Sequence, residues 1–330
     1  MRMRSAAQVC CHMLYGSVMN MKNKSSVLRF LRLLVIDFVI LLCIRLLLFA
    51  GGCLPAGAPS RAGAEREAAR ASAPSPAAVR LPVLMYHSVR RGPESDYAVT
   101  PDTLEEDFRY LKSLNWEAVS PEQLIRFVRE GIPLPEKPVL LTFDDGFYNN
   151  LSYVLPLLET YDLCATVNVV GMFTTELAEA DSHQPAYSYL TAEDLCRLQK
   201  SGRISFGNHT DRMHSRTDRK GCMRMPGETE RDYHAVLYAD LAAVQAFFDR
   251  TLHETPVVFA YPYGFYSPES EPVLKQLGFA VTLSCTEGIN RLTDDPDCLY
   301  RLCRYNRAGN LGTEAFFARI QRALDKDSAA

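Results

Sequence analysis

The amino-acid sequence predicts an α/β protein with about seven parallel strands, each followed by a helix. Along residues 81–330, short apolar or β-branched runs alternate with stretches whose apolar residues recur at helical spacing. Several of the short runs are almost wholly apolar, which is typical of parallel strands covered on both faces. These alternations favour a (β/α) barrel, complete or partial, with an open doubly wound sheet as the alternative.

The individual elements can be placed in order along the chain. The predicted strands cover residues 82–86, 138–143, 165–170, 203–207, 256–261, 279–285 and 299–305. The predicted helices cover residues 101–114, 121–130, 148–161, 191–201, 230–252, 268–277 and 313–324. In the first helix, Leu104, Phe108 and Leu111 recur at i, i+4 and i+7 and so share one face. In both architectures ligands bind where strands end, so functional residues are expected there.

The N-terminal part of the chain has a different composition. Residues 1–32 are basic, and the apolar run LLVIDFVILLCIRLLLFA, residues 33–50, is long enough to cross a bilayer. Positive charge before such a run holds that side in the cytoplasm, so we predict a single-pass transmembrane signal-anchor with an extracellular domain. Asp37 and Arg45 are unfavourable inside a membrane, which leaves a soluble N-terminal helix as the alternative.

The sequence leaves the lipidation and the translation start of this end of the chain undecided. Cys53 follows small residues in FAGGC, loosely as at a lipoprotein processing site, and translation could begin at Met19 or Met21. Residues 51–80 are rich in Ala, Pro, Gly and Ser and contain almost no large apolar side chains. Such a segment cannot bury a core, so we predict a flexible linker before the folded domain.

Charge and cysteine content limit the partners of the folded domain, residues 81–330. Residues 1–50 carry seven Lys or Arg against one Asp, so the total charge of -3 leaves about -9 for the rest. An acidic body argues against a nucleic-acid partner, which requires a basic face. Six of the ten cysteines lie in the folded domain, and outside the cell they could form disulfides, although the sequence does not select a pairing.

Two adjacent carboxylates follow a buried strand. The stretch VLLTFDDGFYNN places Asp144 and Asp145 directly after the predicted strand over 138–143. One carboxylate could cap the next helix, but adjacent side chains point in different directions, so capping explains only one of them. A buried carboxylate is costly without a partner, so a metal ion or a proton is expected nearby.

Three histidines follow other predicted strands. His209 and His214, in NHTDRMH, come after the strand over 203–207, and His87 follows the strand over 82–86. A spacing of five residues cannot place both histidines of the pair on one helical face, so they require a loop. Two imidazoles and a carboxylate form a ligand set that suits catalytic zinc, with one coordination position open for water.

Together these motifs resemble the polysaccharide deacetylase family, the NodB-homology domain of carbohydrate esterase family four. The resemblance rests on PVLMYHSV, TFDDG, NHTDRMH and FAYPYG, in this order, across about residues 81–322. The His-Thr-X-X-X-His spacing is similar to a bacterial subgroup that includes poly-N-acetylglucosamine deacetylases. The resemblance implies a deformed (β/α) barrel of seven or eight strands and a divalent metal, usually Zn²⁺, used to hydrolyse acetyl groups on a glycan.

The resemblance also implies a role for each matching residue. Asp144 resembles the general base, and Asp145, His209 and His214 resemble the metal ligands. The backbone N–H of Tyr263, in AYPYG, resembles the donor that stabilises the oxyanion. The chemistry is consistent with these roles, because zinc lowers the pKa of water to about 7 and a carboxylate one residue from a ligand can accept the proton.

The sequence departs from the family pattern at two positions. Ala260 stands where many members have an arginine that orients the catalytic aspartate, so the partner of the base is open. No histidine follows His253, so the late histidine that protonates the leaving amine is absent. His87 is the expected substitute because of its place at a strand end, and a metal-bound water or a ligand histidine is the alternative. Arg304 and Asn306, near the last predicted strand, could contact the substrate.

The predicted function is hydrolytic deacetylation of N-acetylated amino sugars in an extracellular polymer of the peptidoglycan or poly-N-acetylglucosamine type. We expect the chain to act as a monomer, with the acetylated glycan and the membrane as its partners. One alternative is a glycan-binding pseudoenzyme that keeps the metal site but has lost catalysis with the missing arginine and late histidine. The other is an O-acetyl esterase of the xylan type. The complete Asp, Asp, His, His set favours an enzyme, because a binding protein does not need the second carboxylate.

Overall fold

The computed structural model describes residues 78–178 and 183–328. The predicted signal-anchor over 33–50 and the candidate lipidation residue Cys53 lie outside the described residues, as do residues 51–77 of the predicted linker. Within the described residues, no helix combines the length and apolar character needed to cross a membrane.

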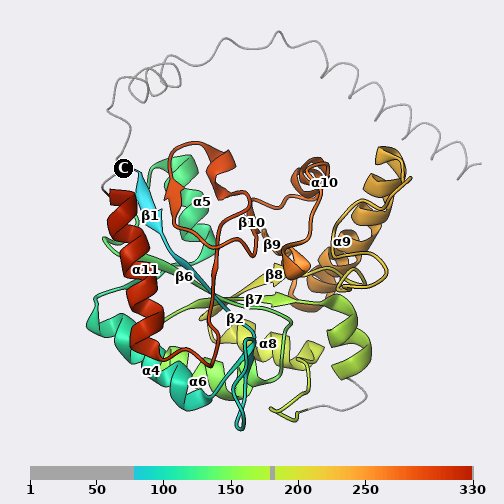
Figure 1. The fold of residues 1–330 in the computed structure, drawn as a ribbon. Helices are drawn as coiled ribbons and strands as arrows, with labels where there is room; N and C mark the ends of the chain where they lie inside the picture. The colour runs from blue at the N-terminus through green and yellow to red at the C-terminus, as the bar shows by residue number, and fades with distance from the viewer. Residues whose placement is uncertain (1–77, 179–182, 329–330) are drawn as a thin grey trace, which may run out of the picture. The chain divides into compact units, whose positions relative to one another are not determined.

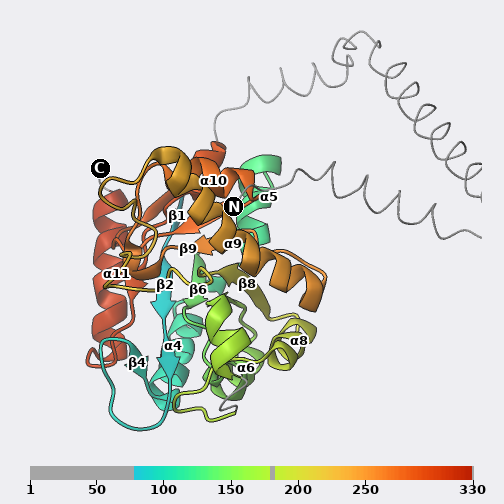
Figure 2. The ribbon, with the colours of Figure 1, turned by 90° about the vertical axis from the view of Figure 1, so that its right-hand side faces the viewer.

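A curled sheet of parallel strands lies at the centre of the described structure (Figures 1 and 2). Its strands follow the order β10, β9, β8, β7, β6, β2 and β12, and β5 pairs with β6 beside this path. They are β2 (Val83–Tyr86), β5 (Glu117–Ala118), β6 (Pro138–Phe143), β7 (Ala165–Val169), β8 (Ile204–Asn208), β9 (Val258–Ala260), β10 (Val281–Leu283) and β12 (Tyr305–Asn306). The order runs in one direction and sets the last strand beside the first, as in a barrel rather than a doubly wound sheet.

Helices lie around the outside of this sheet (Figure 1). They are α4 (Pro101–Ser113), α5 (Pro121–Glu130), α6 (Leu155–Thr160), α8 (Ala192–Lys200), α9 (Glu230–Leu252), α10 (Ser270–Gln276) and α11 (Thr313–Ser328). Short π-helical turns at Asn150–Val154 and Phe173–Leu177 and 3₁₀ turns at Pro262–Gly264 and Pro296–Leu299 complete the helical segments. The bounds of α5 and α9 coincide with the helices predicted over 121–130 and 230–252.

Local sequence explains why α5 begins and ends where it does. The Ser120 hydroxyl accepts a hydrogen bond from the Gln123 backbone N–H, while the Gln123 side chain accepts one from the Ser120 N–H. This capping box satisfies two N–H groups that the helix itself leaves without partners. Pro121 occupies the first turn, where its missing N–H costs nothing, and Gly131 ends the helix with φ at 71°.

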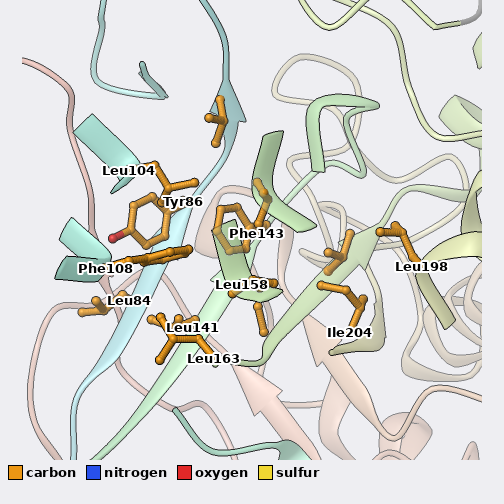
Figure 3. Close-up of a cluster of buried hydrophobic side chains, with 14 of the residues drawn as sticks. Leu84, Tyr86, Leu104, Phe108, Leu141, Phe143, Leu158, Leu163, Leu198 and Ile204 are labelled. Carbon is orange, nitrogen blue, oxygen red and sulfur yellow. The ribbon is translucent and has the colours of Figure 1, made fainter. Parts of the chain in front are cut away.

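Apolar side chains from the sheet and the surrounding helices form the main core (Figure 3). Leu84 and Phe143 of the sheet lie in one cluster with Phe108 of α4 and Leu198 of α8, and all four are fully buried. The wholly apolar predicted strands therefore do have both faces covered. This packing fixes the carboxyl ends of β2, β6, β7 and β8, which carry the candidate functional residues.

The strand predicted over 299–305 is wrong in most of its length. Pro296–Leu299 forms a 3₁₀ turn, and only Tyr305 of the predicted segment belongs to β12. Arg301 has φ at 60°, a left-handed conformation that interrupts an extended strand. Beyond this turn, the Ser284 N–H donates to the Leu302 carbonyl at 2.9 Å, which links the chain entering β12 to the opposite edge of the sheet.

Small two-stranded pairs at the periphery were not predicted. β1 (Val79–Leu81) pairs antiparallel with β11 (Asn290–Leu292), and β3 (Ser88–Val89) pairs in parallel with β4 (Ala98–Val99). Within the described residues, β1 includes residues 79 and 80 of the predicted linker. Two- and three-residue strands are too short for a hydrophobic period to be read from the sequence.

The cysteines of the described structure are free thiols. Burial raises the pKa of Cys164 to about 11 and the pKa of Cys222 well above its ordinary value. Both thiols are therefore protonated at neutral pH, and a protonated thiol is a poor nucleophile.

Candidate active site and metal centre

The paired carboxylates lie at the carboxyl end of β6, in a sharp turn. The Asp144 N–H donates to the Tyr86 carbonyl of β2 at 2.9 Å, which continues the sheet for one more residue. Asp145 and Gly146 then both adopt left-handed backbone conformations, with φ at 74° and 70°. Aspartate tolerates this region better than most residues. The turn lets both carboxylates line the same cavity.

Asp145, His209 and His214 converge as three potential metal ligands, a group called the three-ligand site below. The Asp145 Oδ1 lies 3.1 Å from the His214 Nε2 and 3.7 Å from the His209 Nε2. One donor atom from each residue lies within 4.8 Å of the others, and within the described ranges this is the group that could hold a metal ion. His209 directly follows β8, and Thr210, with φ at 70°, begins the loop that returns His214 to it.

The protonation states in the three-ligand site suit a divalent cation. The His209 Nδ1 lies 2.7 Å from the Ala260 carbonyl, so Nδ1 carries the hydrogen and Nε2 keeps its lone pair. Burial lowers the pKa of His209 to about 4, which keeps the ring neutral. Burial alone would raise the pKa of Asp145, but the hydrogen bond with His214 and nearby histidines hold it below its ordinary value. A carboxylate with a neutral imidazole is donor chemistry that suits zinc.

Asp144 is held by one oxygen and leaves the other free. Its Oδ1 accepts hydrogen bonds from the Asn168 Nδ2 at 2.7 Å and the Arg304 Nη1 at 2.8 Å. Its Oδ2 lies 4.0 Å from the His209 Nε2, beside the three-ligand site. Burial would raise the pKa of Asp144, but the charge and hydrogen bond of Arg304, together with the nearby histidines, outweigh burial and keep the pKa well below its ordinary value. Asp144 is therefore an ionised carboxylate with a free oxygen.

Arg304 is the partner that the sequence left open, and it does not lie where we expected. Its side chain is fully buried and pairs with Asp144 rather than facing the substrate. The Arg304 Nε also donates to the Ser284 carbonyl at 2.7 Å, which fixes the plane of the guanidinium. The positive partner of Asp144 is therefore supplied by the segment before β12. An arginine at position 260, at the end of β9, is not needed for this role.

Asn168 was missed by the sequence reasoning. It lies on β7 among apolar neighbours and is fully buried. A Cβ atom on Gly207 of the neighbouring β8 would lie 1.9 Å from the Asn168 Oδ1, so only glycine leaves room for the amide. An amide side chain inside a largely apolar strand was the available signal, because a buried amide requires a hydrogen-bond partner.

The cavity around these groups has a volume of about 530 Å³ and opens at the carboxyl ends of the strands. His87, Tyr97 and Asn306 line it together with both carboxylates. The His87 Nδ1 is buried and has no hydrogen-bond partner within the described structure. The Asn306 amide donates to the Asp96 carbonyl at 2.8 Å and is thereby held at the rim. The cavity thus unites the residues predicted at three different strand ends.

Tyr263 lies at the edge of the same cavity in an unusual backbone conformation. Its φ is 57°, in the left-handed region that bulky residues rarely adopt. In the part of the chain that the structure describes, its backbone N–H donates no hydrogen bond. Its hydroxyl lies 3.1 Å from the His214 Nδ1. The turn therefore presents a free N–H donor beside the three-ligand site.

Comparisons with known proteins agree with this arrangement. The family model described as polysaccharide deacetylase matches residues 131–282. YxkH of Bacillus subtilis is 24% identical over 242 residues, which cover 73% of this chain and 76% of that protein. Poly-beta-1,6-N-acetyl-D-glucosamine N-deacetylase of Escherichia coli is 24% identical over 211 residues, covering 58% of this chain and 31% of that protein. The chain thus spans about a third of the E. coli protein.

The fold is also shared with a solved structure. Streptococcus pyogenes deacetylase PplD, solved in complex with acetate, superposes with a TM-score of 0.60 at 22% identity. The superposition covers 73% of this chain and 98% of PplD. The matched family model leads to one assignment: the folded part of this chain, in which the model covers residues 131–282, belongs to the polysaccharide deacetylase family.

Proposed function

We propose that this chain is a metal-dependent N-deacetylase of an extracellular amino-sugar polymer of the peptidoglycan or poly-N-acetylglucosamine type. The observation that carries the proposal is that Asp144 presents its free Oδ2 beside the three-ligand site. The name of the E. coli relative supports an N-acetylated amino sugar as substrate. The basic residues before the apolar run at 33–50 support a location outside the membrane, which protease protection of the full chain in intact cells tests.

We assign a residue of this chain to each step of the proposed reaction. At the three-ligand site of Asp145, His209 and His214, a bound divalent metal would supply Lewis acidity for the acetyl carbonyl and for water. Asp144 accepts the proton of the attacking water at Oδ2, since its Oδ1 is already occupied. The Tyr263 N–H donates to the carbonyl oxygen as negative charge develops on it.

The metal dependence and the substrate class are tested together. The purified full-length chain is expected to release acetate from N-acetylglucosamine oligomers, to lose this activity in a chelator, and to regain it with Zn²⁺ or Co²⁺. O-acetylated xylan, assayed in parallel, tests the esterase alternative. If no acetylated glycan yields metal-dependent acetate, the enzyme proposal fails.

His87 is proposed as the acid that protonates the leaving amine, because its ring lines the cavity with an unpartnered nitrogen. His87→Gln is expected to lower acetate release from the oligomers by roughly 10²–10⁴-fold. An activated phenyl acetate needs no protonation of its leaving group, so its hydrolysis is expected to fall much less. Equal losses on amide and ester substrates would instead assign His87 a structural role.

One ground for the pseudoenzyme alternative does not hold. That alternative rested partly on the missing arginine at Ala260, and the structure supplies a guanidinium from Arg304. A glycan-binding protein without activity has no use for a buried cation that keeps Asp144 ionised. The second ground, the missing late histidine, is addressed by the His87 experiment.

A further inference from the structure

We propose that the Tyr263 hydroxyl is a positioning group for the metal site: it holds the ring of His214 and thereby sets the affinity for a divalent cation. This inference rests on the metal centre in the proposed function. It concerns the side chain of Tyr263, whereas the oxyanion role concerns only its backbone N–H.

The geometry fixes which nitrogen of His214 serves which partner. The Nε2 faces the Asp145 Oδ1 at 3.1 Å, inside the three-ligand site. The Nδ1, on the other side of the ring, lies 3.1 Å from the Tyr263 hydroxyl. For Nε2 to offer a lone pair to a cation, Nδ1 must carry the hydrogen and the Tyr263 oxygen must accept it. The Tyr263 hydroxyl can accept that hydrogen, so its contact with Nδ1 holds the ring with Nε2 toward the three-ligand site.

The two histidine ligands differ in how they are held. His209 is almost fully buried, and its Nδ1 is bonded to the backbone carbonyl of Ala260. His214 comes from a loop, and within the described residues its Nδ1 meets a side chain, Tyr263, rather than the backbone. The edge of Phe173, with ring centres 5.3 Å apart, adds packing but no hydrogen bond. Outside the three-ligand site, the hydrogen bond that orients His214 is thus the one to the Tyr263 hydroxyl.

The backbone of Tyr263 strengthens the inference. With φ at 57°, this position favours glycine, and a tyrosine there is strained. The turn and the free N–H could both be made by glycine, so they do not explain the aromatic side chain. The centre of the Tyr263 ring lies 4.7 Å from that of the His214 ring, with the two planes tilted by 44°, and the Arg216 guanidinium lies 5.4 Å from the Tyr263 ring centre. The side chain is therefore held over the ligand that its hydroxyl contacts.

The test measures metal affinity directly, without relying on activity. Zn²⁺ affinity of the full-length chain is measured by competition with a chromophoric chelator, for the wild type and for Tyr263→Phe. Removing a group that orients a metal ligand typically weakens affinity by about 10–100-fold, and we expect a loss in that range. The Co²⁺ absorption spectrum is expected to shift as well, because the orientation of one ligand changes.

Tyr97→Phe is the matched control. Tyr97 lines the same cavity, and its hydroxyl makes no hydrogen bond to the described part of the chain. Its removal is expected to leave both the Zn²⁺ affinity and the Co²⁺ spectrum unchanged. Circular dichroism of both variants confirms that the fold is retained.

The outcomes separate this inference from the proposed function. Weaker Zn²⁺ binding in Tyr263→Phe alone supports the inference, even if the wild type releases no acetate from any glycan. Equal affinity and equal spectra in the wild type and Tyr263→Phe would overturn it, whatever the activity. A wild-type chain that binds neither Zn²⁺ nor Co²⁺ would overturn the metal centre and this inference together.

Discussion

Asp144→Asn is expected to lower acetate release from N-acetylglucosamine oligomers by roughly 10²–10⁴-fold. The amide oxygen of asparagine can still accept hydrogen bonds from Arg304 and Asn168, but it cannot take a proton from water. Because the pKa of Asp144 is held below its ordinary value, the wild-type carboxylate is ready to act as a base throughout the neutral range. Initial rates measured at saturating substrate and metal give the effect on kcat.

The same substitution has a structural side effect that needs its own control. It leaves the buried guanidinium of Arg304 without a negative partner, so the variant is also expected to be less stable. The assay is therefore run well below the melting temperature, and Zn²⁺ binding by competition shows that the three-ligand site is intact. A folded, zinc-binding Asp144→Asn variant with wild-type acetate release would remove Asp144 as the base.

The parts of the fold that could be predicted are those with strong local patterns. β6 was predicted with its bounds because a parallel strand covered on both faces is an apolar run. The predicted ends of α5 coincide with the structure because Ser120 is the N-cap and Gly131 the C-cap of this helix. The strand predicted over 299–305 was wrong because turns interrupt the extended chain there. The position of these turns depends on hydrogen bonds to the end of β10, which the sequence does not reveal.

In the candidate site, too, some residues could be predicted from local sequence patterns and others could not. The three-ligand site follows from a general rule, that functional groups gather at the carboxyl ends of parallel strands, so strand positions were enough to bring its residues together. The Arg304 partner could not be found in this way. Asp144 and Arg304 are 160 residues apart, and the bond depends on where a short, irregular segment before β12 crosses the sheet. Only tertiary structure supplies that information.

Arg307→Met is expected to lower the free energy of unfolding by about 3–5 kcal/mol, measured by urea denaturation. The Arg307 guanidinium and the Asp107 carboxylate are both fully buried and share two hydrogen bonds, at 2.8 and 3.0 Å. Tyr86 and Thr313 also donate to this carboxylate. Because methionine fills similar space without charge, the loss reports the buried carboxylate left without a cation. Asp107→Leu combined with Arg307→Met is expected to recover much of it.

Arg291→Met is the matched surface control for this buried pair. The Arg291 side chain is 50% exposed and pairs with Asp327, so its loss is expected to cost only about 0–1 kcal/mol. An effect of Arg307→Met no larger than that of the control would show that the buried pair adds no more than a surface pair.

The pH dependence of the Arg307→Met deficit identifies its cause. Burial raises the pKa of Asp107, and Arg307 opposes that shift, so the pKa of Asp107 rises further in the variant. A carboxyl whose pKa is raised in the folded state contributes stability below its unfolded pKa, and that contribution is lost as pH increases. The deficit is therefore expected to be smaller near pH 4, about the unfolded pKa of aspartate, than near pH 7. The same deficit at both values would attribute the loss to packing, because a neutral carboxyl and a charged one would then be equally tolerated.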